Sequence, residues 1–470
     1  MKRLVIIVMA LCSSLGMSAQ MQSDSPDSTL YLTLEDALKI ALSENVSVQV
    51  ADREILRSDY ALKGTYASLF PQIDASANYQ RTIKKQVMYM DFDMGSLTGG
   101  AMGGDDIPGA SEGVGGPTPG GGIEVGRWNT FSAGVSAAMP VINAQLWRSI
   151  KISGQDVELA VEKARGSRLD MVSQVKSVYF ATLLAKQALE VYEQVYSNAV
   201  ESFRITEMRY NVQKASELDY TRAKSAVSNA IPAMNDAASA VVLSLWQLKA
   251  VIGLDLDTDI DVVGSLDDYS SEMFRAIHEN DDATPENNSS LRQLAIQAEE
   301  LANAIKLQQE AYLPSLALSF SYSMNAMTND FKFSEYNWSP YSFVGLSLSI
   351  PIFSGGKRNA NVKQAKVQYD ELQLQTKDAE RQLKIAIRQY LNQMETQMKS
   401  YSAAEDAVET AQKAYGIASK SYSIGRSTLT DLNDAQLALT QAQLSMCQTV
   451  YEFMIAKTNL EQTLGKDFQE

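Results

Sequence analysis

The chain has very little histidine and cysteine. Across 470 residues, His278 is the single histidine, and Cys12 and Cys447 are the two cysteines. So few of these side chains cannot supply a histidine- or cysteine-based metal site, a histidine general base or a disulfide framework. No Ser/His/Asp set, phosphate-binding loop or metal-ligand spacing appears either. The sequence therefore predicts neither an enzyme nor a bound cofactor.

Positive charge and proline are also scarce. The 41 Lys and Arg residues stand against 56 Asp and Glu residues, which gives a formal net charge of −15. Because an acidic chain is poorly suited to a phosphate backbone, nucleic acid is not expected as a partner. With 45% hydrophobic residues and only 11 prolines, the chain is expected to pack rather than to remain disordered.

Long apolar runs are missing beyond the N-terminal segment. Residues 1–19 have the order of a secretory signal peptide, with Lys2 and Arg3, an apolar core from Leu4 to Leu11, and small residues up to Ala19. We therefore expect the chain to be exported. No later stretch approaches the 18 consecutive apolar residues of a membrane-spanning helix. An exported chain of this kind is expected either to stay soluble in the envelope or to insert as a β-barrel.

An internal repeat sets the predicted domain organisation. Asn45–Pro71 matches Asn288–Pro314 without gaps, and further on Tyr210, Asp219 and Gly253 match Tyr422, Asp431 and Gly465. The two blocks differ in offset, which a glycine-rich insertion in the first half explains. We predict repeat 1 over 20–253, a linker over 254–287 and repeat 2 over 288–470.

Each repeat contains a predicted β-hairpin, over 72–141 and 315–352. Apolar and polar residues alternate along both, as in strands with one polar face, and each strand is long enough to cross a hydrocarbon layer. The first hairpin encloses the loop 95–126, which has 13 of the 26 glycines and reads as mobile. Trp128 and Tyr336 lie near the loop ends, where an interfacial aromatic belt is expected. Four strands cannot close a barrel, so either several chains join or the sheet is soluble.

Long helical hairpins complete each repeat. Between Lys357 and Leu464 there is no proline, and helix-favouring residues predominate. We predict turns at 211–215 and 423–427, with arms that pack side by side as coiled coil. Pro232 is expected to kink the second arm of the first hairpin.

The order of these elements resembles the TolC-type outer-membrane efflux channel family. The shared features are Leu34–Leu38 after Thr33, the proline-bounded strands, Tyr422-x-x-Gly425 and the Asp431–Asp434 stretch. The resemblance implies a mixed α and membrane-β fold: long α-helical coiled-coil hairpins and a four-strand contribution to a trimeric twelve-strand β-barrel. It implies a homotrimer in outer-membrane lipid, with a helical tunnel in the periplasm, that serves as the exit duct of a tripartite efflux or type I secretion system. A periplasmic coiled-coil adaptor or a structural envelope protein without a pore is the alternative.

The candidate functional residues lie around the two turns. Ser216-x-x-Asp219 and Thr428-x-x-Asp431 each fit a helix capping box, which is a purely structural explanation. Asp434 adds a second carboxylate to the face of Asp431. The resemblance implies that these two acids form rings at a periplasmic gate; solvated acids beside a helix dipole are the alternative.

The resemblance also implies a latch and docking tips. Tyr422 and Asp219 flank the two turns at matching places and would be joined by a hydrogen bond in a closed state; an unconnected surface tyrosine and a simple helix cap are the alternative. The expected partners are a periplasmic adaptor (membrane fusion) protein and an inner-membrane pump. The adaptor would contact the tip residues Val212, Gln213, Lys214, Ala215, Ile424, Gly425, Arg426 and Ser427.

Overall fold

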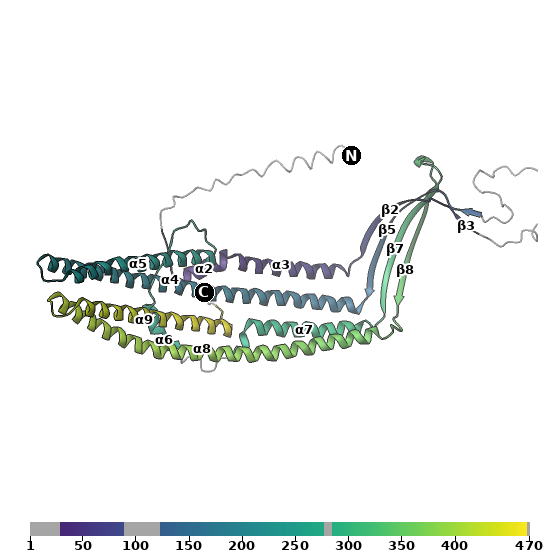
Figure 1. The fold of residues 1–470 in the computed structure, drawn as a ribbon. Helices are drawn as coiled ribbons and strands as arrows, with labels where there is room; N and C mark the ends of the chain where they lie inside the picture. Colours follow the sequence, from purple (N-terminus) through teal and green to yellow (C-terminus); the bar gives the residue numbers. More distant parts are fainter. Residues whose placement is uncertain (1–28, 89–122, 277–283, 468–470) are drawn as a thin grey trace, which may run out of the picture. The chain divides into compact units, whose positions relative to one another are not determined.

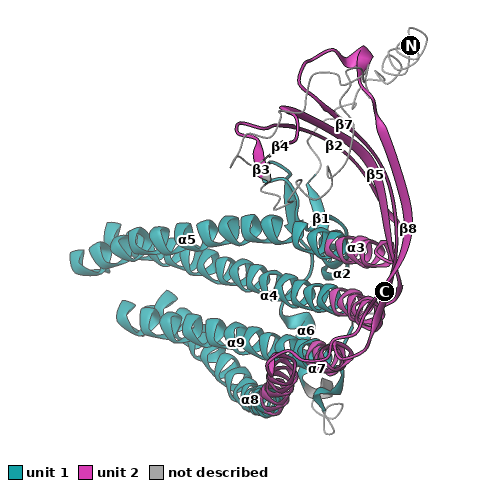
Figure 2. Cartoon of the chain, turned by 90° about the vertical axis from the view of Figure 1, so that its right-hand side faces the viewer, with its two compact units in different colours: residues 1–53, 162–292, 378–470 teal, residues 54–161, 293–377 magenta. Residues whose placement is uncertain are grey.

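The computed structural model describes residues 29–88, 123–276 and 284–467. They fall into two compact units, shown in Figure 2. Unit 1 comprises residues up to 53, 162–292 and 378–470, and unit 2 comprises 54–161 and 293–377. The predicted signal peptide, His278 and all but the last residues of the glycine-rich loop lie outside the described residues.

Unit 2 contains a four-stranded antiparallel sheet. Its strands, hydrogen-bonded in the order β2-β5-β7-β8, are β2 (Gln72–Arg81), β5 (Asn129–Ile142), β7 (Ser315–Thr328) and β8 (Ser339–Ser349) (Figure 1). β2 and β8 are thus the two edges. The loop ends carry a short second pair, β3 (Gln86–Met88) and β4 (Ile123–Val125), and the 3-10 turn η3 (Phe333–Glu335).

The register gives this sheet two chemically different faces. Tyr79 pairs with Phe131, Val135 with Tyr322, and Leu318 with Leu346, so large apolar side chains share one face. The opposite face carries the pairs Asp74–Ser136, Ser136–Ser321 and Ser319–Gly345. Successive strand residues point to opposite sides, so the alternation read from the sequence is sufficient to produce this division. The apolar face remains exposed in the single chain, with Val344 at 71% and Leu346 at 69%.

Four helices begin in one unit and end in the other. They are α3 (Val46–Ala67), α4 (Ala144–Asn211), α7 (Ser289–Glu310) and α8 (Lys357–Ser423). In unit 1, α4 is followed by α5 (Glu217–Ile252) and α8 by α9 (Leu429–Leu464), giving two helical hairpins (Figure 1). α5 is one helix through Pro232. No helix among the described residues is both long and apolar enough to cross a membrane.

The main core of unit 1 lies where the helical hairpins meet small elements. Tyr179, Phe180 and Phe453 are almost fully buried there. They pack with α2 (Leu34–Glu44) and with the parallel pair β1 (Leu30–Leu32) and β6 (Ile260–Val262). Thr33 caps α2 in a capping box with Asp36.

The segment 254–287, predicted as a linker, contributes structure to this core. It contains β6, α6 (Asp267–Ala276) and η2 (Pro285–Asn287). Ile260, Val262, Leu266 and Met273 are buried in it, with at most 2% exposure. These four apolar side chains anchor the segment against the helices.

The same backbone contact occurs at the C-terminal ends of α5 and α9. The Asn45 side-chain amide donates to the carbonyl of Val251 at 2.7 Å, and that of Asn288 donates to the carbonyl of Thr463 at 2.8 Å. Each helix then ends in a left-handed glycine, Gly253 or Gly465. The residues of these two contacts are related by the same sequence offsets as the two blocks of the internal repeat.

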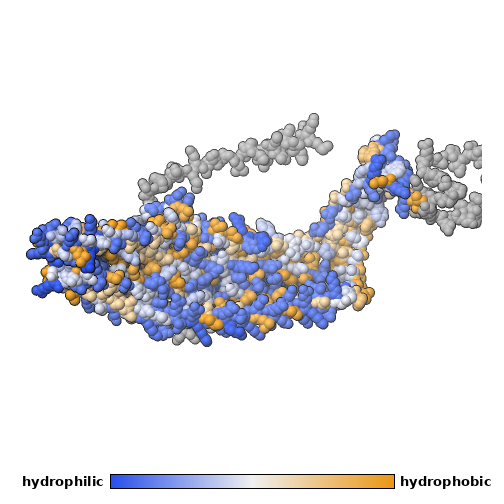
Figure 3. Space-filling model, viewed as in Figure 1, coloured by the Kyte–Doolittle hydropathy of each residue, from blue (hydrophilic) through white to orange (hydrophobic). Residues whose placement is uncertain are grey.

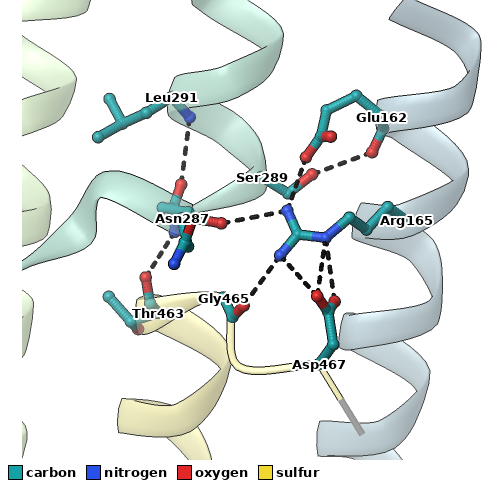
Figure 4. A network of polar contacts seen from close by, with 9 residues as sticks. Glu162, Arg165, Asn287, Ser289, Leu291, Thr463, Gly465 and Asp467 are labelled. Atoms are coloured by element: carbon teal, nitrogen blue, oxygen red, sulfur yellow. Dashed lines mark hydrogen bonds and ion pairs between the residues drawn. The ribbon is translucent and has the colours of Figure 1, made fainter. Parts of the chain in front are cut away.

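Only the second of these ends is enclosed by an arginine, shown in Figure 4. The Arg165 guanidinium donates to the carbonyls of Gly465 at 2.9 Å and Asn287 at 3.1 Å, and it pairs with the carboxylates of Glu162 and Asp467. These bonds hold the end of α9, η2 and α4 together within unit 1.

Candidate functional site at the hairpin tips

The two predicted turns have the same backbone geometry. The amides of Lys214 and Arg426 each donate to the carbonyl five residues earlier, at 2.7 and 2.8 Å. The preceding residue is left-handed in both turns: Gln213 has φ of 56° and Gly425 has φ of 78°. Gln213 is the one non-glycine residue with positive φ among those described. This conformation ends each helix and satisfies its last carbonyls, but it strains a residue that has a Cβ.

Most of the predicted tip residues are accessible. All eight are exposed except Ala215 and Ser427, which are half-buried. Val212 and Ile424 occupy matching places and are 62% and 66% exposed. Each tip thus presents one apolar side chain beside its left-handed residue.

Asp431 and Asp434 lie on the first two turns of α9, and both are exposed. The predicted capping box is confirmed: the Asp431 carboxylate accepts from the Thr428 amide at 2.9 Å and from its hydroxyl at 2.7 Å. These bonds, the amide first, lower the pKa of Asp431 below its ordinary value of 3.8. Within the described part of the chain, no hydrogen bond or ion pair of the Asp434 side chain occurs, so its role is not explained by capping.

Tyr422 is buried rather than displayed at the surface. Its ring is 4% exposed and lies with Ala223, Leu429 and Leu432 in a small cluster at the base of the tips. Its hydroxyl is hydrogen-bonded to the hydroxyl of Thr206 on α4. Because Thr206 donates its own proton to the Ser202 carbonyl at 2.6 Å, Tyr422 is the donor in the shared bond.

An arginine strengthens this connection between the hairpins. The Arg209 guanidinium stacks over the Tyr422 ring at 5.1 Å and donates to the Ser423 carbonyl at 2.8 Å. α4 is therefore tied to the end of α8 by one buried hydroxyl pair and one cation–π contact.

The structure does not bring the two predicted latch residues together within the chain. The Asp219 carboxylate accepts from the Ser216 hydroxyl at 2.7 Å, as part of the cap of α5, while the Tyr422 hydroxyl is occupied by Thr206. The contacts of Thr206 and Arg209 with Tyr422 were not predicted from the sequence. The available signal was their place one turn before the first tip, where side chains at i and i+3 share a helix face.

The fold matches those of solved outer-membrane channels. The Campylobacter jejuni CmeC channel is similar with a TM-score of 0.67 and 18% identity, over 92% of this chain and 85% of that chain. The open-state Neisseria gonorrhoeae MtrE channel is similar with a TM-score of 0.68 and 18% identity, over 94% of both chains. These likenesses define the class of fold as that of outer-membrane channel proteins.

Sequence comparison places the chain in a family. Residues 37–254 and 282–466 match the model of the outer membrane efflux protein family, and the chain belongs to that family. Outer membrane protein TolC of Escherichia coli is 23% identical over 350 residues, which are 72% of this chain and 70% of the relative. The resemblance drawn from the sequence is thus confirmed, and the protein is an outer-membrane efflux protein.

Proposed function

We propose that the chain is one subunit of a passive exit duct in the outer membrane. Substrates delivered by an inner-membrane pump and a periplasmic adaptor would pass through it, in a tripartite efflux or type I secretion system. Membership of the outer membrane efflux protein family supports this assignment. The duct would need no cofactor and no chemistry of its own, because the pump would supply the energy.

The four-stranded sheet is the observation that carries the proposal. β2 and β8 leave the backbone groups of two edges without strand partners in the single chain. Unpaired edges are not tolerated in hydrocarbon, so the sheet must close with other copies. β2 and β8 run in opposite directions, since three antiparallel pairings separate them. The β8 of one copy can therefore pair antiparallel with the β2 of the next, and three copies would give twelve strands.

The faces of the sheet suit such a barrel. The face with Tyr322 and Leu346 would contact lipid, and the face with Ser136 and Ser321 would line the interior. This division is the alternation of apolar exterior and polar interior that membrane barrels show.

The matched helix ends support two tandem structural repeats. The Asn45–Val251 and Asn288–Thr463 bonds, each beside a left-handed glycine, are the same contact made twice. Three chains would then contribute six similar helical hairpins to a tunnel. The hydrogen bonds and ion pairs of Arg165 at the end of α9 would distinguish the second repeat from the first.

At the tips, we assign the gate to Asp431 and Asp434. In a trimer, their exposed carboxylates would form two adjacent rings of three acids, which favour cations and repel anions. The cap keeps Asp431 ionised, because its pKa is lowered. In a closed state, the Tyr422 hydroxyl would exchange Thr206 for Asp219, which forms the predicted latch.

We assign docking of the adaptor to the two tips. Val212 and Ile424 would supply the apolar contacts, with the other six predicted tip residues around them. Exposed apolar side chains of this kind suit a helical partner that packs against the tips.

A pair of lysine substitutions in β8 tests the duct. Leu346→Lys places a charge on the apolar face, and Ser347→Lys places the same charge on the polar face one residue away. In mild detergent, native mass spectrometry should find three chains of roughly 50 kDa for the wild type and Ser347→Lys. Leu346→Lys should insert poorly, because a lysine on the lipid face costs about 2–4 kcal/mol at mid-depth.

Two results would refute this function. One is a monodisperse wild-type monomer in mild detergent that retains mixed α and β circular dichroism. The other is equal outer-membrane insertion of both lysine variants, since the sheet would then have no lipid face.

A further inference from the structure

Aromatic side chains form a cluster at the loop end of the sheet, on its apolar face. The Tyr79 and Phe131 rings are 4.8 Å apart, and Phe131 lies 5.2 Å from Phe333 and 5.5 Å from Tyr336. Phe331 completes the cluster, 6.0 Å from Tyr79. The rings of Tyr79, Phe331 and Phe333 remain 50%, 52% and 58% exposed. The cluster is therefore built on the face expected to meet lipid, yet it is not covered in the chain.

The loop between β7 and β8, which carries Phe331, Phe333 and Tyr336, is held by hydrogen bonds. The Trp128 amide donates to the Asn329 side chain at 3.2 Å, and the Asn129 side chain donates to the Asp330 carbonyl at 3.3 Å. The Tyr336 hydroxyl donates to the same carbonyl at 2.8 Å. The start of the loop is thus fixed to the N-terminal end of β5, and Tyr336 is fixed to the loop.

Cations outnumber acids in the segments that carry this cluster. We define the rim as residues 79–87, 125–131 and 329–338. Its described side chains include five cations and two acids, the cations being Arg81, Lys84, Lys85, Arg127 and Lys332. Figure 3 shows hydrophilic and hydrophobic residues side by side at this end of the sheet. The charge of the rim is therefore opposite in sign to the net charge of −15 of the whole chain.

Three of the five cations lie next to aromatic residues. Arg81 continues the row of Tyr79 on the apolar face, Lys332 lies between Phe331 and Phe333, and the Lys85 amine is 4.9 Å from the centre of the Trp128 ring. Both acids lie on the loop of Lys332: the Asp330 carboxylate accepts from the Thr328 hydroxyl at 2.7 Å, and the Glu335 carboxylate pairs with the Lys332 amine at 3.9 Å. Five cations against two acids still leave the described side chains of the rim with a net positive charge.

We propose that this rim binds the phosphorylated headgroup of an anionic lipid in the leaflet at the loop end of the barrel. Aromatic rings settle at the boundary between hydrocarbon and headgroups, which places the adjacent cations at the level of lipid phosphates. Lys and Arg both donate to phosphate oxygens, and each contributes to binding at an anionic surface. The inference rests on the proposed insertion of the sheet in a membrane.

The test compares binding of phosphatidic acid and phosphatidylcholine to the trimer in nanodiscs, with retained lipids counted by native mass spectrometry. The variant is Arg81→Gln with Lys85→Gln and Lys332→Gln. Loss of one cation should weaken phosphatidic acid binding about fivefold, and the triple variant about a hundredfold. The matched control is Lys63→Gln with Lys151→Gln and Lys366→Gln, three exposed cations on helices of the same unit, and it should bind as the wild type does.

Two further experiments test whether a lipid, a free phosphate or a segment of the chain occupies the rim. Inorganic phosphate at millimolar concentration should not displace the lipid; displacement would overturn the assignment to a lipid. The segment 89–122 contains five acids and no cation. The triple substitution is therefore also made in a chain from which Gly99–Gly121 has been excised. If the substitution weakened phosphatidic acid binding only in the excised chain, the excised segment would be the partner of the rim cations in the full chain, and the proposal would be wrong.

The outcomes separate this inference from the proposed duct. Trimeric, inserted protein whose triple variant binds phosphatidic acid as tightly as the wild type would overturn the lipid site and leave the duct intact. Wild-type protein that neither inserts nor forms a trimer would refute the duct, and the lipid site with it.

Discussion

Three left-handed glycines allow the backbone geometry of unit 1 to be tested as a graded series. Gly425, Gly253 and Gly465 have φ of 78°, 83° and 67°, so alanine at each would suffer similar backbone strain. What differs is the space that a Cβ would enter. The order of destabilisation therefore measures packing around the glycine and not strain alone.

The magnitudes follow from the nearest atoms. At Gly425 a Cβ would meet only the Arg209 guanidinium at 3.4 Å, so Gly425→Ala should cost about 1 kcal/mol in unfolding free energy. At Gly253 it would lie 3.1 Å from the Glu44 carbonyl oxygen, which raises the expected cost to about 2 kcal/mol.

Gly465→Ala should be the most damaging of the three. Its Cβ would overlap with the carbonyl oxygen of Asn287 and lie 2.6 Å from the carbonyl carbon. The backbone of η2 would have to move, and Arg165 could no longer reach both carbonyls as it does in Figure 4. We expect a loss of at least about 3 kcal/mol.

The assay is thermal and urea unfolding of each purified trimer, followed by helical circular dichroism. The expected order of stability is wild type, Gly425→Ala, Gly253→Ala and Gly465→Ala. Equal losses at all three sites would show that only backbone strain matters. A Gly465→Ala protein as stable as Gly425→Ala would refute the contact between the end of α9 and η2.

Four further predictions concern the tips. Asp431→Ala with Asp434→Ala should lower cation preference and abolish block by multivalent cations in planar-bilayer recordings; unchanged selectivity and block would exclude the acid rings. Thr206→Val should destabilise the protein by about 1–3 kcal/mol, more than the roughly 1 kcal/mol of Tyr422→Phe, because it leaves a buried tyrosine donor unpaired; the reverse order in urea unfolding would contradict the assigned donor. Gln213→Gly should stabilise by about 0.5–1 kcal/mol by relieving left-handed strain, and a lower urea midpoint would argue against that conformation. Because the folded pKa of Asp431 is lowered, its stabilisation should be present above the unfolded value of 3.8 and fade as pH falls through the folded pKa, so Asp431→Asn should show a flatter decline of melting temperature with acid than the wild type.

Features that depend on neighbours in the sequence were predictable. The capping box at Thr428 follows from a hydroxyl and a carboxylate three residues apart, and the structure forms it. At Ser216, the same spacing gives the half in which the hydroxyl accepts from the Asp219 amide. The two different faces of the strands follow from the alternation of apolar and polar residues. Ile73, Ala75, Ala77 and Tyr79 of β2, for example, lie on one face. The turn with Gly425 follows from the conformational freedom of glycine.

Other features required the packed chain. Gln213 is left-handed although its side chain disfavours that conformation, because the helices on both sides fix the turn. The apolar residues Ile260, Val262, Leu266 and Met273 pack because helices distant in sequence form a core with them. The strand order β2-β5-β7-β8 joins elements far apart in sequence, which no local pattern specifies.

The partner of Tyr422 shows the limit most clearly. The resemblance to the efflux channel family implied a hydrogen bond between its hydroxyl and Asp219 in a closed state. In the single chain, the Asp219 carboxylate accepts from the Ser216 hydroxyl at its own helix start, and the Tyr422 hydroxyl is bonded to Thr206, 216 residues away. Local spacing determines caps, turns and strand faces because their partners lie within a few residues. A buried hydroxyl pairs with whichever group the tertiary fold brings within reach, and only the tertiary structure decides that.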